Sequence, residues 1–216
     1  PWFIHNFKKH NTTPLKIFDF GMTNDMKSNL RSMPKSSPSD RKMIVSMKDV
    51  QSKGWYKKPE AMFRASGMAE KVCWIDTDCH VLDNIDDIFD YTEPLKLGMV
   101  EDKPWTMRTG GKFHNSGVVV FEGTPPILDQ WRKKIAEEDR DIGVGMGDQE
   151  VLHAMLRDDP LKKRVYIEDL PNIYNWLRIQ LLDGQDSSKK KIIHWTGFKG
   201  KDHIKRLIGN EDTPSM

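Results

Sequence analysis

The chain of 216 residues is long enough for one sizeable domain with its own hydrophobic core, and its composition is not that of a disordered or fibrous protein. Its 34 basic residues nearly balance 32 acidic ones and are interspersed with them, so nucleic acid is not expected as the main partner. The longest apolar run is about five residues; because a membrane-spanning helix needs roughly 20, no membrane span is expected.

Strand-like apolar segments alternate with helix-like segments along the chain. The predicted strands are, in order, 15–20, 42–47, 71–76, 95–100, 116–123, 164–169 and 191–195. Helices are predicted at 2–10, 59–70 and 125–138, and loops rich in Pro, Gly, Ser or charge at 33–40, 103–112 and 183–191. The alternation predicts an α/β fold with a mostly parallel sheet, in a single domain spanning residues 1–216.

The two cysteines, Cys73 and Cys79, lie six positions apart along one predicted strand and its exit. This separation is awkward for a disulfide bond between them, so both are expected to be reduced thiols. The N-terminus also lacks the basic-then-apolar plan of a secretory signal. We therefore predict a cytoplasmic location.

An Asp-x-Asp pair, Asp76 and Asp78, stands where the predicted strand 71–76 runs out, and ligands of α/β sheets bind beyond such strand ends. Side chains at i and i+2 of an extended segment share a face, so both carboxylates can bind one cation of the Mg²⁺ or Mn²⁺ type. A strand-end turn with ordinary surface aspartates is the alternative. A second pair, Asp139 and Asp141, follows no apolar strand and is predicted to be a solvated face.

Three more segments carry polar residues that could line a site, each with a plainer alternative. Lys58 stands at a predicted helix start, where it can face an anion or simply be exposed. Asn115 and Ser116 precede a strongly β-branched strand and can bind sugar hydroxyls or form a turn. Asp148 and Gln149 follow a glycine-rich loop, where they can form a polar pair at a site, or Asp148 can be a helix N-cap.

The last such segment, residues 192–201, places His194 after a strand and then Gly197, Lys199 and Lys201. An imidazole can join carboxylates on Mn²⁺, glycine lets the backbone approach a phosphate, and lysine offsets diphosphate charge. A purely structural histidine is the alternative.

Taken in order, these segments resemble the motifs of the glycogenin-like family 8 glycosyltransferases, which are retaining enzymes with the Rossmann-like GT-A fold. The family pattern is a lysine segment, hydrophobic-D-x-D, F-N-S-G, G-D-Q, P-x-x-Y-N and H-x-x-G-x-x-K-P-W. The counterparts here are KKP, WIDTD, FHNSG, GDQ, PNIYN and HWTGFKGK, in the same order over residues 57–201. The resemblance thus implies a GT-A domain with a mostly parallel mixed sheet flanked by helices.

It also implies transfer of a hexosyl or deoxyhexosyl unit from a UDP-sugar to a hydroxyl of a glycan or protein, with retention and front-face attack by the acceptor. Asp76, Asp78 and His194 would bind Mn²⁺ or Mg²⁺, and Asp148 and Gln149 would lie beside the anomeric carbon. The remaining contacts to the donor sugar and its diphosphate would come from Lys58, Asp102, Asn115, Ser116, Gly197, Lys199 and Lys201.

Two features depart from the family pattern. Lys199 stands two residues after Gly197 and Lys201 two further on, without the family's Pro-Trp, so either lysine can be the one that meets the diphosphate. The family's opening strand, which carries nucleoside contacts, has no counterpart before the helix at 2–10, and the chain has no initiator methionine. We expect either a truncated chain or nucleoside contacts from elsewhere.

Two other functions are compatible with Asp76 and Asp78. A haloacid-dehalogenase-like, Mg²⁺-dependent phosphohydrolase also ends a strand in Asp-x-Asp, but it predicts the motif on the first strand and a later G-D-x-x-x-D, where this chain has Leu152. A non-catalytic sugar-nucleotide-binding module predicts loss of a metal ligand, whereas both aspartates and His194 are present. The donor sugar, the acceptor, the linkage and the oligomeric state are left open.

Overall fold

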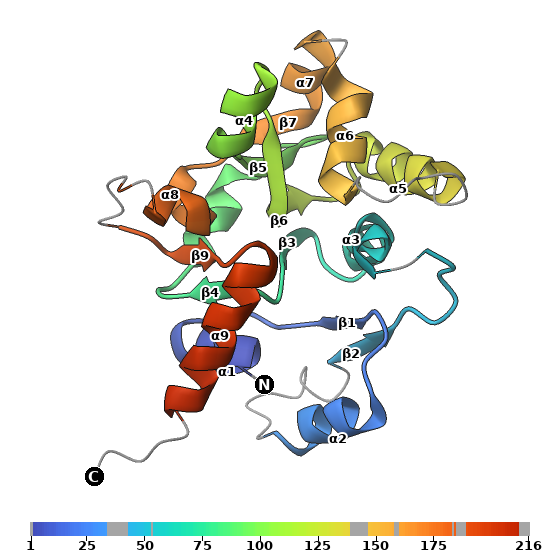
Figure 1. The fold of residues 1–216 in the computed structure, drawn as a ribbon. Helices are drawn as coiled ribbons and strands as arrows, with labels where there is room; N and C mark the ends of the chain where they lie inside the picture. Colours follow the sequence, from blue (N-terminus) through green and yellow to red (C-terminus); the bar gives the residue numbers. More distant parts are fainter. Residues whose placement is uncertain are drawn as a thin grey trace.

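A computed structural model describes residues 2–33, 43–52, 54–138, 147–157, 160–182, 184 and 189–211 (Figure 1). The strands are β1 (Ile17–Asp19), β2 (Ile44–Ser46), β3 (Lys71–Ile75), β4 (Cys79–Val81), β5 (Leu97–Glu101), β6 (His114–Glu122), β7 (Ile167–Asp169), β8 (Trp176–Leu177) and β9 (Ile192–His194). The α-helices are α1 (Trp2–His10), α2 (Asn24–Ser32), α3 (Lys58–Ser66), α4 (Lys103–Thr109), α5 (Pro126–Glu138), α6 (Asp148–Arg157), α7 (Pro160–Tyr166), α8 (Arg178–Leu182) and α9 (Gly197–Glu211).

The central sheet has the strand order β3-β6-β5-β7, with β6 antiparallel to both of its neighbours and β5 parallel to β7. The apolar run of β6 is buried on both faces, which explains its strongly β-branched composition. Val119 and Phe121 pack into a core formed with α3, α5 and α6, whereas Val118 and Val120 pack into a second core on the other face. Full burial of each such side chain stabilises the fold by about 1.5–3 kcal/mol.

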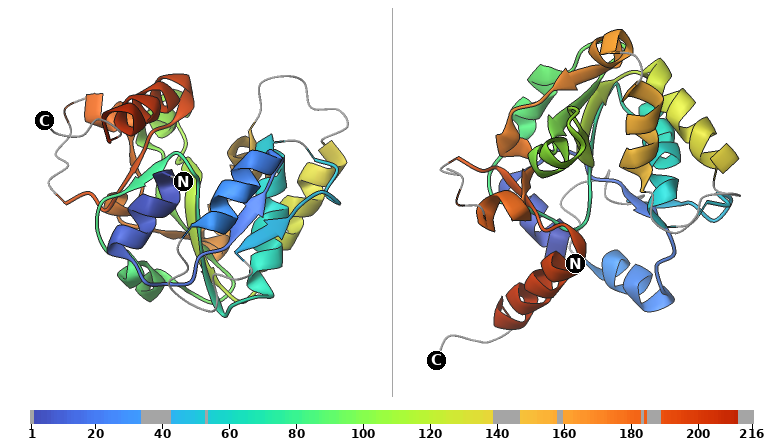
Figure 2. Two further views of the ribbon diagram at one scale, coloured as in Figure 1. Left: turned by 90° about the horizontal axis from the view of Figure 1, so that it is seen from below. Right: turned by 45° about the horizontal axis from the view of Figure 1, so that its top comes forward.

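The face of the central sheet opposite to those helices is covered by a small sheet of order β4-β9-β8, with α1 packed against β4. Figure 2 shows α3, α5 and α6 gathered on the other side. The pair β1-β2 is a separate parallel sheet that shares a third core with α1 and α2. Because β4 and β9 are antiparallel, Cys79 lies directly opposite His194.

The α/β class with mixed sheets between helices is confirmed, and strands lie within or across all seven predicted ranges. Strands β4 and β8 were not predicted because their three and two residues are too short for a recognisable period. Of the loops predicted at 33–40 and 183–191, most residues lie outside the described part of the chain, as do Asp139 and Asp141.

The loop predicted at 103–112 is wrong over most of its length, since residues Lys103–Thr109 form α4. The Asp102 carboxylate caps this helix by accepting a hydrogen bond from the Trp105 N–H, a proline occupies its first turn, and Gly110 ends it with φ 72°. An aspartate cap, an early proline and a final glycine are helix-boundary signals, whereas the prediction took the proline and glycines as signs of a loop.

The strand predicted at 164–169 is half wrong, because Arg164–Tyr166 complete α7 and the strand is confined to Ile167–Asp169. Among the described helices, none is long and apolar enough to cross a membrane. Cys73 and Cys79 are both free thiols, as predicted.

Candidate active site

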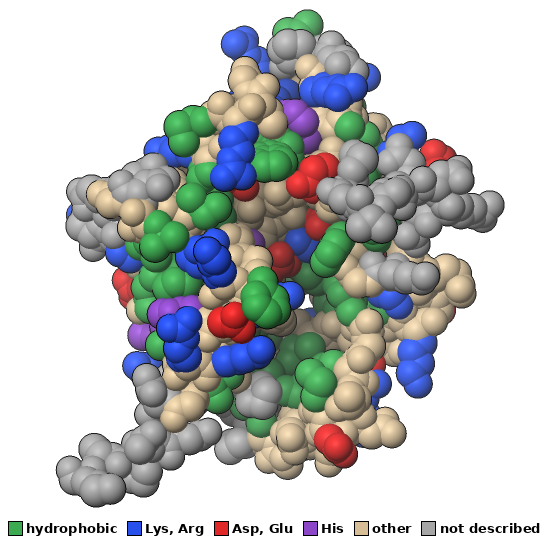
Figure 3. All heavy atoms as spheres, viewed as in Figure 1, with side chains coloured by type: hydrophobic (Ala, Val, Ile, Leu, Met, Phe, Trp, Pro, Cys, Tyr) green, Lys and Arg blue, Asp and Glu red, His purple; other side chains and the backbone are tan. Residues whose placement is uncertain are grey.

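The polar residues singled out in the sequence gather at one edge of the central sheet. The end of β3 and the start of β6 lie at the same edge because these strands are antiparallel, with Ile75 opposite Val118. The first residues of α3 and α6 and the end of β9 reach the same place, as their contacts below show. In the space-filling view this face is hollowed near its centre, with acidic and basic side chains around the hollow (Figure 3).

Lys58, the first residue of α3, is a buried cation surrounded by polar groups; only 4% of its surface is exposed. Its Nζ donates hydrogen bonds to Asp76 Oδ2 at 2.9 Å and to Ser116 Oγ at 3.0 Å, and lies 3.3 Å from Asp148 Oδ2. Burial lowers the pKa of Lys58, but the two carboxylates outweigh it, and the net shift of the pKa is upward. The ammonium therefore stays charged and holds both carboxylates.

Both oxygens of Asp76 are engaged. Oδ2 accepts from Lys58, and Oδ1 accepts from the indole Nε1 of Trp74 at 2.7 Å. The Trp74 ring lies 6.0 Å from the rings of both Phe18 and Phe20, measured between centroids, so aromatic contacts surround this donor.

Asp148, the first residue of α6, is likewise buried and held through one oxygen. Ser116 Oγ donates to its Oδ2 at 2.7 Å, next to the contact with Lys58. Burial raises the pKa of Asp148 against the opposing effect of Lys58. The backbone carbonyl of Asp148 accepts from Trp131 Nε1 at 2.9 Å, so the helix start is tied to the core on the same side of the sheet.

Asn115 is the centre of a buried hydrogen-bond network. Its Nδ2 donates to Asp102 Oδ2 and to Gln149 Oε1, each at 3.2 Å. Its Oδ1 accepts from the Gly117 N–H and from Asn175 Nδ2, each at 2.9 Å. One amide thereby joins the residues predicted to hold the donor sugar to those around His194.

His194, at the end of β9, faces amide oxygens with one ring nitrogen and a carboxylate with the other. Its Nδ1 lies 3.1 Å from both Asn115 Oδ1 and Asn175 Oδ1, so Nδ1 carries the proton and donates. In the neutral ring Nε2 then carries the lone pair, and it lies 3.2 Å from Asp78 Oδ1. A lone pair and a carboxylate oxygen at this distance need a cation between them, either a proton or a metal.

A divalent cation fits this arrangement. Two ligand atoms about 2.0–2.2 Å from one ion are separated by roughly 2.8–3.1 Å at octahedral angles and roughly 3.3–3.6 Å at tetrahedral angles, and the 3.2 Å between Asp78 Oδ1 and His194 Nε2 lies between these ranges. Burial raises the pKa of Asp78, but His194 and, more weakly, Lys201 lower it, with a net downward shift. Among the described residues, Asp78, Cys79 and His194 are grouped with ligand atoms within 4.8 Å of one another; Asp76 is not in this group.

Gly117 provides the space for the His194 ring. A Cβ at this position would lie 2.1 Å from His194 Cε1 and 2.3 Å from Nδ1, distances that no side chain tolerates. Sequence reasoning included Gly117 in a motif but gave it no role, and it gave none to Asn175. The signal that could have identified Asn175 is its place as the last residue of the PNIYN motif.

Gly197, Lys199 and Lys201 form the start of α9, and both lysines are exposed. Gly197 has φ 72°, which glycine adopts without strain. The charge of Lys201 is one of the smaller causes that lower the pKa of Asp78.

The sequence matches no protein-family model and no curated protein. Its structure is similar to those of glycosyltransferases. An active-site mutant of LgtC, a galactosyltransferase also solved with donor and acceptor sugar analogs, has a TM-score of 0.56 at 12% identity, over 95% of this chain and 88% of LgtC.

GlyE of Streptococcus pneumoniae TIGR4 has a TM-score of 0.55 at 17% identity, over 90% of this chain and 50% of GlyE. A glycosyltransferase involved in glycosylation of the major capsid of PBCV-1 has a TM-score of 0.51 at 13% identity, over 75% of this chain and 82% of that protein. At these identities the similarity establishes a shared fold. The chain has the GT-A glycosyltransferase fold.

Proposed function

We propose that this protein is a metal-dependent glycosyltransferase that moves a hexosyl or deoxyhexosyl unit from a UDP-sugar to a hydroxyl of a glycan or protein, with retention. The observation that carries the proposal is the pairing of Asp78 Oδ1 with His194 Nε2 at 3.2 Å, beside a buried polar network at the sheet edge. A location in the cytoplasm is part of the proposal, supported by the two free thiols.

In this proposal Asp78 and His194 would hold Mn²⁺ or Mg²⁺. Asp76, the third ligand predicted from the sequence, would have to give up its hydrogen bond from Lys58 or Trp74 to join them. A bound divalent ion supplies Lewis-acid stabilisation of the charge that develops on the leaving diphosphate. Asn115 and Asn175 orient the His194 ring so that its lone pair faces Asp78.

The diphosphate is placed at the start of α9. Gly197 would let the backbone of this helix start approach a phosphate closely, and the exposed Lys199 and Lys201 would offset the phosphate charge. We prefer Lys201 because its charge contributes to lowering the pKa of Asp78. The sequence also predicted a diphosphate contact for Lys58. Since Lys58 is buried between two carboxylates, we assign it the role of holding Asp76 and Asp148 in place.

Asp102, Asn115, Ser116, Asp148 and Gln149 bind the donor sugar in this proposal. Asp148 Oδ2 is held by Lys58 and Ser116, which supports a binding and orienting role for this carboxylate over that of a free nucleophile. With Gln149 it stabilises the sugar as the anomeric bond breaks. The acceptor then attacks from the front face, and its proton passes to the departing phosphate.

The phosphohydrolase alternative is less well supported. It requires a nucleophilic carboxylate at the Asp76 position, where both oxygens already accept hydrogen bonds, and its first-strand placement does not match β3, an outer strand paired antiparallel with β6. Nothing specific favours the non-catalytic module, since the predicted metal ligands and the polar network are intact.

A thermal-shift screen of UDP-sugars with and without Mn²⁺ tests the proposal. A UDP-sugar should raise the unfolding temperature, and more so with Mn²⁺, because a ligand that binds the folded state stabilises it. Absence of stabilisation by every UDP ligand would overturn the assignment. Release of inorganic phosphate from a sugar phosphate would favour the phosphohydrolase.

A further inference from the structure

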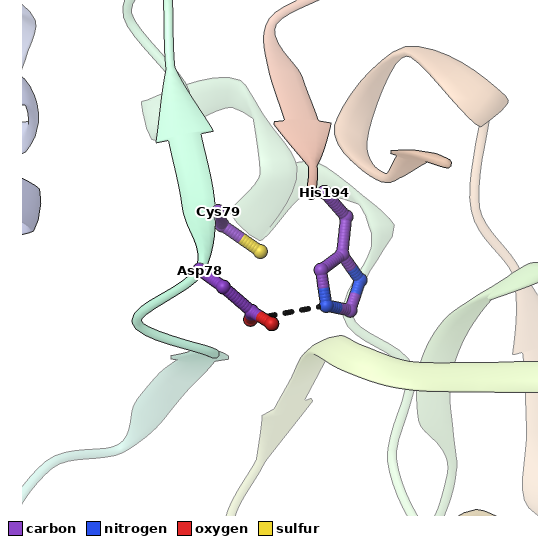
Figure 4. Close-up of side chains that lie close together, drawn as sticks. All are labelled: Asp78, Cys79 and His194. Carbon is purple, nitrogen blue, oxygen red and sulfur yellow. Dashed lines mark ion pairs between the residues drawn. The ribbon is translucent and has the colours of Figure 1, made fainter. Parts of the chain in front are cut away.

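The cation position described above has a sulfur atom beside it. Cys79 follows Asp78 directly and lies opposite His194 in the β4–β9 ladder, so its side chain is on the same face as the imidazole. The close-up shows its Sγ directed toward the space beside Asp78 and His194 (Figure 4). One sulfur, one oxygen and one nitrogen ligand atom thus lie within 4.8 Å of one another.

The second carboxylate of the Asp-x-Asp pair is less available than this sulfur. Asp76 Oδ1 and Oδ2 accept short hydrogen bonds from Trp74 and Lys58, at 2.7 and 2.9 Å. The Cys79 thiol donates to the Gly117 carbonyl at 3.9 Å, a long and weak contact. If the sulfur became a metal ligand, only this weak hydrogen bond would be lost. If Asp76 became a ligand, at least one short hydrogen bond from Trp74 or Lys58 would be lost.

We propose that Cys79 is a ligand of the metal held by Asp78 and His194, and that this mixed sulfur, nitrogen and oxygen site binds a thiophilic divalent ion of the Zn²⁺ or Co²⁺ type more tightly than Mn²⁺. The proposal rests on the proposed function for the position of the ion. Thiolate and imidazole ligands suit Zn²⁺ and Co²⁺, whereas Mn²⁺ suits carboxylates, carbonyls and water. The cation also gains a third protein ligand without any change at Lys58 or Trp74.

Binding replaces the S–H bond of Cys79 with a metal–sulfur bond, and the thiol proton leaves to the solvent. Each ion bound should therefore release one proton from Cys79, which calorimetry in buffers of different ionisation enthalpy measures. No electron is transferred, so the step needs no oxidant.

Cobalt spectroscopy of the purified protein tests the proposal, with the other cysteine as a matched control. Wild type and Cys73→Ser should both show the near-ultraviolet sulfur-to-cobalt charge-transfer band on Co²⁺ addition. Cys79→Ser should lose the band while keeping the weaker visible bands of bound Co²⁺. The ratio of Zn²⁺ to Mn²⁺ affinity should fall by at least about tenfold in Cys79→Ser and stay unchanged in Cys73→Ser.

If wild type binds Co²⁺ without the charge-transfer band, or Cys79→Ser retains it, Cys79 is not a ligand and the proposed function stands. If wild type binds neither Co²⁺ nor Mn²⁺, the metal site itself is refuted. X-ray absorption of the Zn²⁺-loaded wild type gives an answer even if Cys79→Ser does not fold: a sulfur neighbour at about 2.3 Å supports the proposal, and a shell of nitrogen and oxygen alone overturns it.

Discussion

Gly117→Ala should displace the His194 ring and remove tight metal binding. The added Cβ would lie 2.1 Å from His194 Cε1, whereas carbon atoms in contact prefer about 3.5–4.0 Å, so the ring must move by roughly 1.5 Å. Functional geometry tolerates about 0.5 Å, and a 1 Å misplacement costs about 100-fold. We therefore expect the affinity for Mn²⁺ or Co²⁺ to fall by about 100-fold.

Calorimetric titration of the metal measures this loss, and a second glycine supplies the control. Gly98→Ala would place a Cβ 2.7 Å from Val120 Cγ1 and 3.1 Å from Leu170 Cδ2, inside the core and away from the site. Overpacking should lower the free energy of unfolding of both variants by about 1–3 kcal/mol. For a chain of this size, each kcal/mol lowers the melting temperature by about 2–4 °C. Only Gly117→Ala should lose metal affinity.

Wild-type metal affinity in a folded Gly117→Ala protein would show that the position of the His194 ring does not matter for the ion. Equal losses in Gly117→Ala and Gly98→Ala would point to general destabilisation. Either result would refute the assignment of Gly117 as the residue that makes room for this ligand.

Three further substitutions test the network around the site. Lys58→Met should lower the free energy of unfolding by about 3–5 kcal/mol, because Asp76 and Asp148 lose the buried cation between them. Urea unfolding measures this loss, and a change of less than about 0.5 kcal/mol would contradict the prediction. Asn175→Leu should weaken metal binding by about 10–100-fold, because His194 loses the hydrogen bond to Asn175 that orients its ring. A thermal melt shows whether the variant is folded, and unchanged metal affinity in the folded variant would exclude the orienting role of Asn175. Asp78→Asn should abolish metal-dependent UDP binding, whereas the exposed Asp83→Asn should bind as wild type does; equal binding by both would remove Asp78 from the site.

Much of the candidate site could be predicted because its residues stand at element boundaries. Asn115, Asp148 and His194 each begin or end a recognisable apolar segment, and the edges of a layered sheet bring such ends together. The helix α4 was missed although its boundary signals were present in the sequence, because the proline and the two glycines that bound it are equally frequent in loops, and only the structure shows Asp102 accepting the Trp105 N–H.

The sequence by itself determined the order of the seven longer apolar segments that contain strands, three of the helices and the set of polar side chains at their ends, because these depend on periodicity and composition over a few neighbouring residues. Only the tertiary structure decided how those side chains are divided among partners. It ties Asp76 to Lys58 and Trp74, and sets Asp78 against His194. These contacts join residues far apart in the chain, and no local pattern encodes which of two neighbouring carboxylates a buried lysine will hold.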